Sequence, residues 1–515
     1  MKLKTQRRLF PMIRQVLPGR HAMLGLMILF HPLMMMACVA DFSDNGVVPN
    51  DYDKWAYQEA RKLYDAKEYD AAAEAFQAQL DHYPKGDHAP NAHYYLGRIQ
   101  FVRGDMPGAR EKFLLVIKNY PDHDYMDNAQ FWAGRTYFEE ENYTEALPYF
   151  QKVIDLKGFY LDGAWFYRAR CMFELGEIAA ALADLQTLMA DFPDSSYRDN
   201  AQYWIGRLYL AQADFATAIS EFQKVLDQYP DSFYRDSAQY YIGYTYEEQG
   251  DALTLAGDSA GAGSAYDAAV VAYQALVSDY PDSSFVDNAQ YHIGRVRLTQ
   301  GDFTAARAEL QKVLDLYPGS FYESAAQYYI GFAYEEEGRA LQAAVLPGAA
   351  TQFANARAAY LQFLTKYPTD GYADNAQYHL GRMELELANY GAARTELQKV
   401  LTLYPGSFYE PAAQYYIGFA HEEEANVLLL AADPAAATQF AAARTAYQLL
   451  LSTYPQSSYG DNAQYHIART YHDQQDCVNE KSAMQAVLDK FPTSFYAGYA
   501  TNHIASINAG GHTCL

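Results

Sequence analysis

Apolar side chains recur along most of the chain at the spacing of amphipathic helices, in stripes that come two by two. One stripe contains Ala201, Ile205 and Leu208, and the next runs from Phe215 to Tyr229. Pro230 then ends the second helix because it lacks an amide proton and clashes with the preceding turn. The following residues, Asp231 and Ser232, offer capping oxygens to the next helix. The pattern therefore predicts an all-α chain built from helix pairs.

The aromatic–proline pair that closes each unit recurs along the chain and gives the number of units. It occurs at Tyr83, Tyr120, Phe192, Tyr229, Tyr280, Tyr317, Tyr367, Tyr404, Tyr454 and Phe491, with a degenerate copy at Leu156-Lys157. The steps are 36 or 37 residues at first and then alternate between 37 and 50 or 51. We expect about 11 helix pairs over residues 51–491, and a capping helix and tail over 492–515.

The long units add 13 or 14 residues between their two helices, near residues 251–265, 339–352 and 426–439. Leucine and alanine continue the helical pattern into each addition, which predicts extended helical hairpins. Val427 to Leu430 make the last hairpin distinctly apolar. These apolar residues either pack within their own hairpin or form a contact patch for a partner or lipid.

The N-terminus has the pattern of a secretory signal. Six Lys or Arg residues precede an apolar stretch from Ala22 to Ala37, which is shorter than the roughly 20 residues that span a bilayer. We assign residues 1–37 to a signal peptide and 38–50 to a tether, with translation starting at Met1 or Met12. Residues 35–38 read MMAC, which resembles a bacterial lipobox with Cys38 as the acylated residue; ordinary cleavage nearby is the alternative. If Cys38 is acylated, Val39 favours sorting to the outer membrane by that resemblance.

Charge, cysteine content and the absence of catalytic motifs limit the functions that the sequence can have. From Cys38 onward 33 basic residues face 63 acidic ones, so nucleic acid is not an expected partner. Cys477 and Cys514 could form a disulfide in an oxidising compartment, whereas Cys171 fits a buried helix position. No catalytic motif is present, and we expect no enzyme activity, cofactor or metal site.

Three repeated polar features have ordinary explanations. His292, His379 and His466 recur as copies of one duplicated unit, too far apart to share an ion. The acidic runs at 139–141, 247–248, 335–337 and 422–424 are expected to form a solvated face. Asp199 and its copies Asp287, Asp374 and Asp461 begin helices, where capping is expected.

The repeat resembles the tetratricopeptide repeat. Counted from Gly206, the residues Tyr209, Phe215, Ala218, Phe222 and Pro230 fall at that family's intervals. The resemblance implies a right-handed superhelix in which the first helix of each pair lines a concave groove. The exported N-terminus and the YP-x-S-x-Y style further resemble the BamD (YfiO) outer-membrane assembly lipoproteins and, more distantly, the CpoB (YbgF) coordinators.

One register of the first helices is the candidate partner-binding surface. The residue after the glycine, or its equivalent, faces the groove by family resemblance; it is Arg in short units and aromatic in long ones. These residues are Arg98, Arg135, Arg170, Arg207, Tyr244, Arg295, Phe332, Arg382, Phe419 and Arg469. Arginine and aromatic side chains suit peptide capture. The alternative is that each arginine pairs with an acid on the adjacent helix and holds the stack together.

These features predict a non-enzymatic, periplasm-facing scaffold, lipid-anchored in the outer membrane through Cys38, that binds partner proteins in outer-membrane protein assembly. The alternative is a soluble periplasmic coordinator of cell-wall enzymes.

Overall fold

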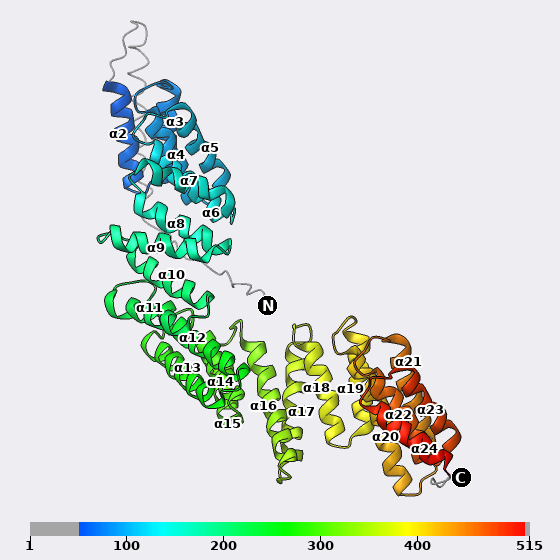
Figure 1. Cartoon of the computed structure of the whole chain (residues 1–515). Helices are drawn as coiled ribbons and strands as arrows, with labels where there is room; N and C mark the ends of the chain where they lie inside the picture. The colour runs from blue at the N-terminus through cyan, green and yellow to red at the C-terminus, as the bar shows by residue number, and fades with distance from the viewer. Residues whose placement is uncertain (1–50, 510–515) are drawn as a thin grey trace, which may run out of the picture. The chain divides into compact units, whose positions relative to one another are not determined.

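The computed structural model describes residues 51–509, and within them every regular element is an α-helix. Helices α2 to α23 form eleven pairs joined by short turns, and α24 follows as a single helix (Figure 1). The prediction of an all-α chain with about 11 helix pairs and a capping helix is therefore confirmed. We call the two helices of each pair its first and second helix.

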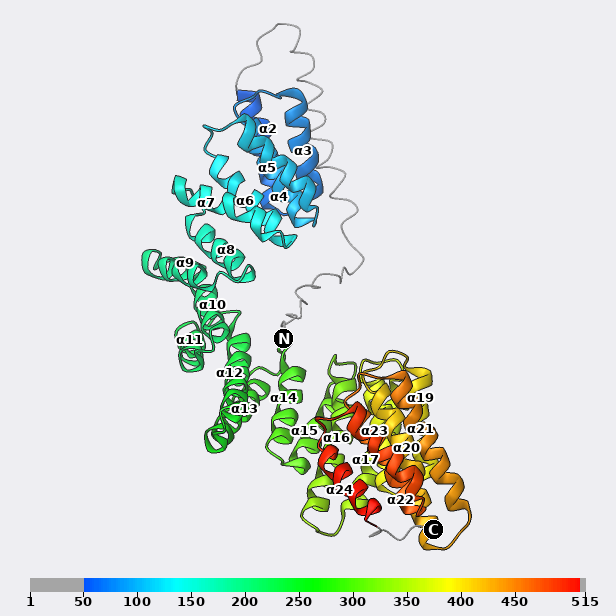
Figure 2. The ribbon, with the colours of Figure 1, turned by 45° about the vertical axis from the view of Figure 1, so that its right-hand side comes forward.

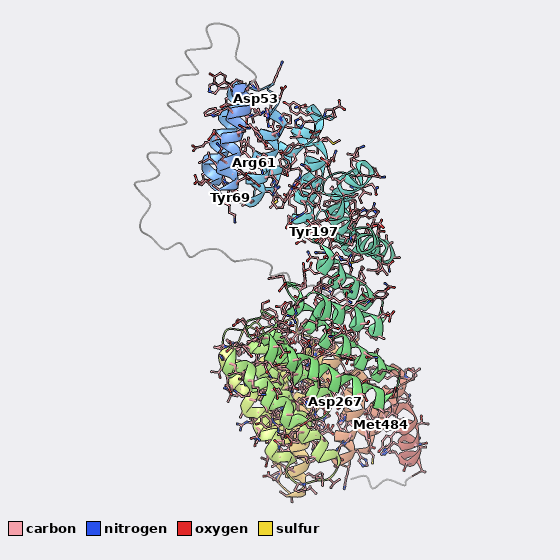
Figure 3. All side chains as sticks on the ribbon, turned by 90° about the vertical axis from the view of Figure 1, so that its left-hand side faces the viewer. Asp53, Arg61, Tyr69, Tyr197, Asp267 and Met484 are labelled. Atoms are coloured by element: carbon pink, nitrogen blue, oxygen red, sulfur yellow. The ribbon has the colours of Figure 1, made fainter. Side chains whose placement is uncertain are left out.

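The chain divides into two compact units, one ending at Tyr197 and one beginning at Arg198. The first unit contains α2 (Asp51–Asp65), α3 (Tyr69–His82), α4 (Ala89–Val102), α5 (Met106–Asn119), α6 (Met126–Glu139), α7 (Tyr143–Leu156), α8 (Leu161–Glu174) and α9 (Ile178–Asp191). Near its start, Asp53, labelled in Figure 3, accepts hydrogen bonds from the His88 amide and the Gln79 side chain and so ties α2 to the next two helices.

The second unit contains the short and long pairs in alternation. Its helices are α10 (Arg198–Ala211), α11 (Phe215–Gln228), α12 (Arg235–Leu255), α13 (Ser259–Asp279), α14 (Val286–Thr299), α15 (Phe303–Leu316), α16 (Glu323–Ala343), α17 (Ala349–Lys366), α18 (Ala373–Glu386), α19 (Tyr390–Leu403), α20 (Glu410–Leu430), α21 (Ala435–Thr453), α22 (Gly460–Asp473), α23 (Cys477–Lys490) and α24 (Tyr496–Asn508). Short pairs have helices of 14 residues, whereas both helices of the long pair α12–α13 have 21 residues. Figure 2 shows the longer helices of this unit beside the shorter ones.

A close approach between the two helices of a pair sets the packing. In the pair α10–α11, a Cβ atom added to Gly206 would lie 2.7 Å from ring atoms of Phe222, so only glycine fits there. Phe222 and Ala218 are both fully buried. In the short pairs α14–α15 and α18–α19 a leucine replaces the ring, and the glycine meets Leu310 or Leu397. The small residue on one helix thus allows the large residue of the other to fill the centre of the pair.

The turns between pairs are tied by serine and aspartate. We expected Ser232 to cap the next helix and Asp199 to cap its own. Ser232 instead donates its hydroxyl to Asp199 of the preceding first helix at 2.7 Å and accepts the Tyr234 amide within its own turn. Asp199 does accept the amide of Asn200 at 2.8 Å with its other oxygen. The same serine–aspartate contact recurs at Ser320, Ser407 and Ser494.

A helix crosses a bilayer only if it is both long and apolar enough. Among the residues that the structure describes, no helix combines the length and the apolar character needed to cross a membrane.

The pair core makes a testable prediction. Replacing Phe222 by Ala removes a fully buried ring and leaves a cavity beside Gly206, so we expect a loss of about 3–5 kcal/mol in the free energy of unfolding. Phe233→Ala is the matched control, because Phe233 is 81% exposed and its removal is expected to cost less than about 0.5 kcal/mol. Urea unfolding followed by circular dichroism measures both. Equal losses in the two variants would contradict this account of the core.

Candidate functional site

Eight of the ten predicted groove residues contact the first helix of the next pair within their own compact unit, and the other two, Arg170 and Arg469, have a described contact with the preceding first helix. We call each such contact a junction. All ten side chains are partly exposed. The structure separates the junctions into two chemical kinds, according to whether the residue after the glycine is arginine or aromatic.

In the arginine junctions the guanidinium lies over an aromatic ring of the next first helix. Arg295 on α14 lies 4.1 Å from the ring centroid of Tyr329 on α16, and Arg382 on α18 lies 4.0 Å from that of Tyr416 on α20. Three further pairs have the same arrangement at 3.7–4.2 Å: Arg98 with Trp132, Arg135 with Tyr167, and Arg207 with Tyr241. These cation–π contacts join successive helix pairs.

A tyrosine of the same helix also holds the guanidinium. Arg295 donates to the Tyr291 hydroxyl at 3.1 Å, and Arg98 and Arg382 donate in the same way to Tyr94 and Tyr378. Burial alone would lower the pKa of Arg295, but the nearby tyrosine oxygens and Glu247 outweigh it, so the pKa is raised. These arginines therefore carry a fixed positive charge within the stack.

Arg469 and Arg170 contact the preceding first helix. Arg469 lies 3.4 Å from Glu422 on the preceding first helix, as the ion-pair alternative predicted. Arg170 lies 5.3 Å from the Phe138 ring. Acid pairing on an adjacent helix is thus one arrangement of this register, whereas aromatic stacking is the commoner one among the described residues.

In the long pairs an aromatic residue stands in place of the arginine. On the next first helix, a histidine stands in place of the aromatic ring that the arginine contacts in the other junctions. Tyr244, Phe332 and Phe419 pack edge-on against His292, His379 and His466 of the following first helices, with ring centroids 5.8–6.3 Å apart. We call these the histidine junctions. The position that is Trp or Tyr after a short pair is therefore His after a long one.

Each histidine junction buries a glutamate. Glu335 on α16 accepts a hydrogen bond from the Tyr360 hydroxyl of α17 at 2.7 Å and lies 2.8 Å from Nδ1 of His379 on α18. The copies have the same geometry: Glu422 with Tyr447 and His466, and Glu247 with Tyr273 and His292. The carboxylate thus links both helices of the long pair to the next pair.

This arrangement corrects the expectation that the acidic runs form a solvated face. The side chains of Glu335 and Glu422 are fully buried, and that of Glu247 is 18% exposed. Each lies four residues after the glycine, hence on the same face of the helix as the close contact within the pair. Glu336 and Glu337, by contrast, remain partly exposed.

The histidine junctions perturb the acidity of their members. Burial would raise the pKa of Glu335, but the hydrogen bond and charge of His379, with Arg339 and Tyr360, outweigh it and lower the pKa. The pKa of Glu247 is lowered in the same way by His292 and Tyr273. Burial, reinforced by the neighbouring glutamate, raises the pKa of Tyr273, Tyr360 and Tyr447 well above that of a free tyrosine.

The structure describes two of the cysteines considered in the sequence, Cys171 and Cys477. Cys38 and Cys514 lie outside the described residues, so acylation and the disulfide remain predictions. Cys477 is buried at the start of α23. Cys171 is a free, buried cysteine of α8, and burial raises the pKa of its thiol to about 12.

Comparison with known proteins adds the family context. The sequence pattern of the family described as "YfiO: Outer membrane lipoprotein" matches residues 49–208 and 255–390, together more than half of the chain. A tetratricopeptide-repeat pattern matches residues 200–232, 375–407 and 412–457. The cell division coordinator CpoB of Pseudomonas putida is 39% identical over 54 residues, which is 10% of this chain and 20% of that protein.

Two solved structures with similar folds are distant in sequence. The C-terminal part of a TPR repeat-containing protein from Cytophaga hutchinsonii is 15% identical and covers 65% of this chain and 98% of its own, with a TM-score of 0.37. MamA from Desulfovibrio magneticus is 20% identical and covers 35% of this chain and 98% of its own, with a TM-score of 0.31. No functional conclusion follows from similarities of this size.

The two kinds of junction can be tested by converting one into the other. Glu335→Leu introduces the residue that the short pairs have at this position, Leu298 and Leu385. It also removes the carboxylate that accepts hydrogen bonds from His379 and Tyr360. We expect a loss of about 2–4 kcal/mol in the free energy of unfolding.

The matched control adds Phe332→Arg, Tyr360→Leu and His379→Tyr to Glu335→Leu, which recreates the arrangement of Arg295, Leu310 and Tyr329. We expect this fourfold variant to recover most of the lost stability in urea unfolding. A fourfold variant no more stable than Glu335→Leu would show that the two junctions are not interchangeable units.

The lowered pKa values of Glu247 and Glu335 predict acid lability. Because each folded-state pKa lies below the unfolded value of about 4.5, the stabilisation is present above that pH and is lost as the pH falls through the folded-state values. Urea midpoints measured from pH 7 downward should therefore drop below about pH 4.5. The drop should be smaller in the fourfold variant, which lacks Glu335; an identical drop would contradict this assignment.

Proposed function

The chain belongs to the YfiO family of outer membrane lipoproteins, and from this we propose that it is a non-enzymatic, periplasm-facing scaffold that holds segments of partner proteins during outer-membrane protein assembly. The observation that carries the proposal is the family match over more than half of the chain. The family and the tetratricopeptide repeats support a protein-binding scaffold of the envelope, since such repeats offer extended surfaces for other proteins.

We assign partner binding to the junction residues. They follow one register along the first helices and stay partly exposed, so a partner could contact them without unfolding the stack. Arg382 is held by Tyr416, Tyr378 and Glu386, with 18% of its side chain exposed. A guanidinium fixed in this way loses little conformational entropy when it meets a carboxylate, and a fixed aromatic ring offers rigid contact area. The structural and the binding role are therefore compatible in one residue.

The proposed location is the periplasmic face of the outer membrane, reached by the signal at residues 1–37 and held by acylation of Cys38. The runner-up is a soluble periplasmic coordinator of cell-wall enzymes. The 54-residue similarity to CpoB favours it, although that match covers only 20% of the relative. The two proposals differ in the anchor and in the partners.

Partner binding at the junctions is tested by photo-crosslinking in intact envelopes. A photoreactive phenylalanine analogue replaces Phe332 or Phe419, which keeps an aromatic ring at the histidine junction. We expect defined protein adducts from both positions, and weaker adducts when Arg382→Glu reverses a neighbouring charge. Immunoblotting and mass spectrometry of the adducts measure the result and identify the partner.

Leu316 and Leu403 are the matched control positions, because they are apolar, 62% and 61% exposed, and end the second helices α15 and α19. Equal adducts from these controls, or none from positions 332 and 419, would contradict partner binding at the junctions. Adducts consisting of cell-wall enzymes would favour the coordinator.

The lipid anchor makes a separate prediction. Cells supplied with a labelled fatty acid should incorporate it into the wild-type chain, and Cys38→Ala should abolish the label and release the protein from the membrane fraction. Cys171→Ala serves as the control, since that cysteine is buried within α8. A wild-type chain without label would overturn the anchor and favour the soluble coordinator.

A further inference from the structure

The last helix pair breaks a rule that the other ten obey. Eleven residues before the residue that caps its C-terminus, each second helix from α3 to α21 has a fully buried alanine: Ala72, Ala109, Ala146, Ala181, Ala218, Ala269, Ala306, Ala356, Ala393 and Ala443. In α23 this position is Glu480, which is equally buried. A carboxylate is costly at a site built for a methyl group unless charged or polar partners surround it.

Two histidines surround Glu480, and each comes from a different helix. Nδ1 of His503 on α24 lies 2.9 Å from Glu480 Oε1, and Nδ1 of His472 on α22 lies 3.2 Å from the same oxygen. Helices α22, α23 and α24 pack together (Figure 2), and Met484, one turn after Glu480 on α23, is labelled in Figure 3. The cluster therefore joins the capping helix to the last pair.

This cluster is a rearranged version of the histidine junctions. In those junctions the first helix supplies Glu, the second helix Tyr and the next first helix His. At the end of the chain the first helix supplies His472, the second Glu480, and α24 supplies His503 at the register of His466. Two imidazoles and one carboxylate thus replace one imidazole, one carboxylate and one hydroxyl.

We propose that His472, Glu480 and His503 form a Zn²⁺ site that fastens the capping helix to the solenoid. The three ligand atoms lie within 4.8 Å of one another. In a tetrahedral zinc site with bonds of about 2.0–2.1 Å, ligand atoms stand about 3.3–3.5 Å apart, so small side-chain movements open the cluster around an ion. Two His and one carboxylate suit Zn²⁺ better than Ca²⁺ or Mg²⁺, which take oxygen ligands.

The surroundings hold the ligands in place. The ring of Tyr499 stacks on His503 with centroids 4.4 Å apart, and the His472 ring lies edge-on to His503 at 5.4 Å. His472 is 43% exposed, whereas Glu480 and His503 are 1% and 16% exposed, so an ion has an entry path on the His472 side. A water molecule from that side would complete four-coordination.

Zinc binding to the purified full-length chain tests the proposal. After dialysis against Zn²⁺ and removal of free metal, we expect about one equivalent of zinc per chain by elemental analysis. Competition with a chromophoric chelator should show at least about a tenfold loss of affinity in His503→Gln and in Glu480→Ala. Co²⁺ in place of zinc should give the visible absorption of a four-coordinate site in the wild type alone.

Glu480→Ala is a sharp variant because it restores the residue of the other ten pairs and should keep the fold. Zinc should raise the thermal midpoint of the wild type and leave that of Glu480→Ala unchanged. His292→Gln, in a junction with a single histidine, should bind zinc like the wild type. No bound zinc in the wild type, or equal binding in Glu480→Ala, would overturn the proposal and leave the cluster as a hydrogen-bonded cap.

Discussion

The close approach of the two helices within each pair is the constraint on which the rest of the chain depends. A Cβ at Gly206 would stand 2.7 Å from the Phe222 ring, and the same close contact recurs against Leu310, Tyr360 and Tyr447. This geometry fixes each pair as one rigid module whose apolar side is filled. The junctions, where one module meets the next, are of two chemical kinds.

The junctions bury charge, and they do so in two self-consistent sets. An arginine with an aromatic ring ahead of it satisfies the cation by stacking and by a tyrosine hydroxyl, as at Arg295. In the other set an aromatic residue packs against a histidine of the next first helix. That histidine pairs with the carboxylate of Glu335, and the Tyr360 hydroxyl donates a second hydrogen bond to the same carboxylate. A mixture of the two sets would leave a buried carboxylate or guanidinium without its partner, and such a charge destabilises by several kcal/mol. The junctions that follow short and long pairs therefore differ in four positions at once, three within the pair and one on the next first helix.

The helix pairs could be predicted from the sequence because their determinants are local. Apolar spacing marks each helix, and the proline after Tyr229 or Tyr317 ends it. The charges at the junctions depend on residues 25 to 45 positions away, so the run at 335–337 looked like a solvated face although its first glutamate is fully buried. Two features of the sequence could have indicated this burial. Glu335 lies four residues after Gly331, and the following unit has His where a unit after a short pair has Tyr or Trp. The aromatic partner of each arginine was harder to predict. It depends on which rings of the next first helix lie close to the guanidinium.

The alternation of junctions also explains why a chain would keep an 87-residue double repeat. If all pairs carried the same junction, any pair could dock on any other, and a stack of near-identical modules would have many competing registers. With two kinds of junction, a pair that skips its neighbour and docks on the following pair would set Arg295 against a histidine or Glu335 against a tyrosine ring. A pair that docks two places further along would restore every contact. The duplication thus disfavours a displacement by one place through buried charge, whereas a displacement by two places carries no such penalty. Glu480, the exception to ten alanines, makes the pair α22–α23 chemically unlike the ten described pairs before it.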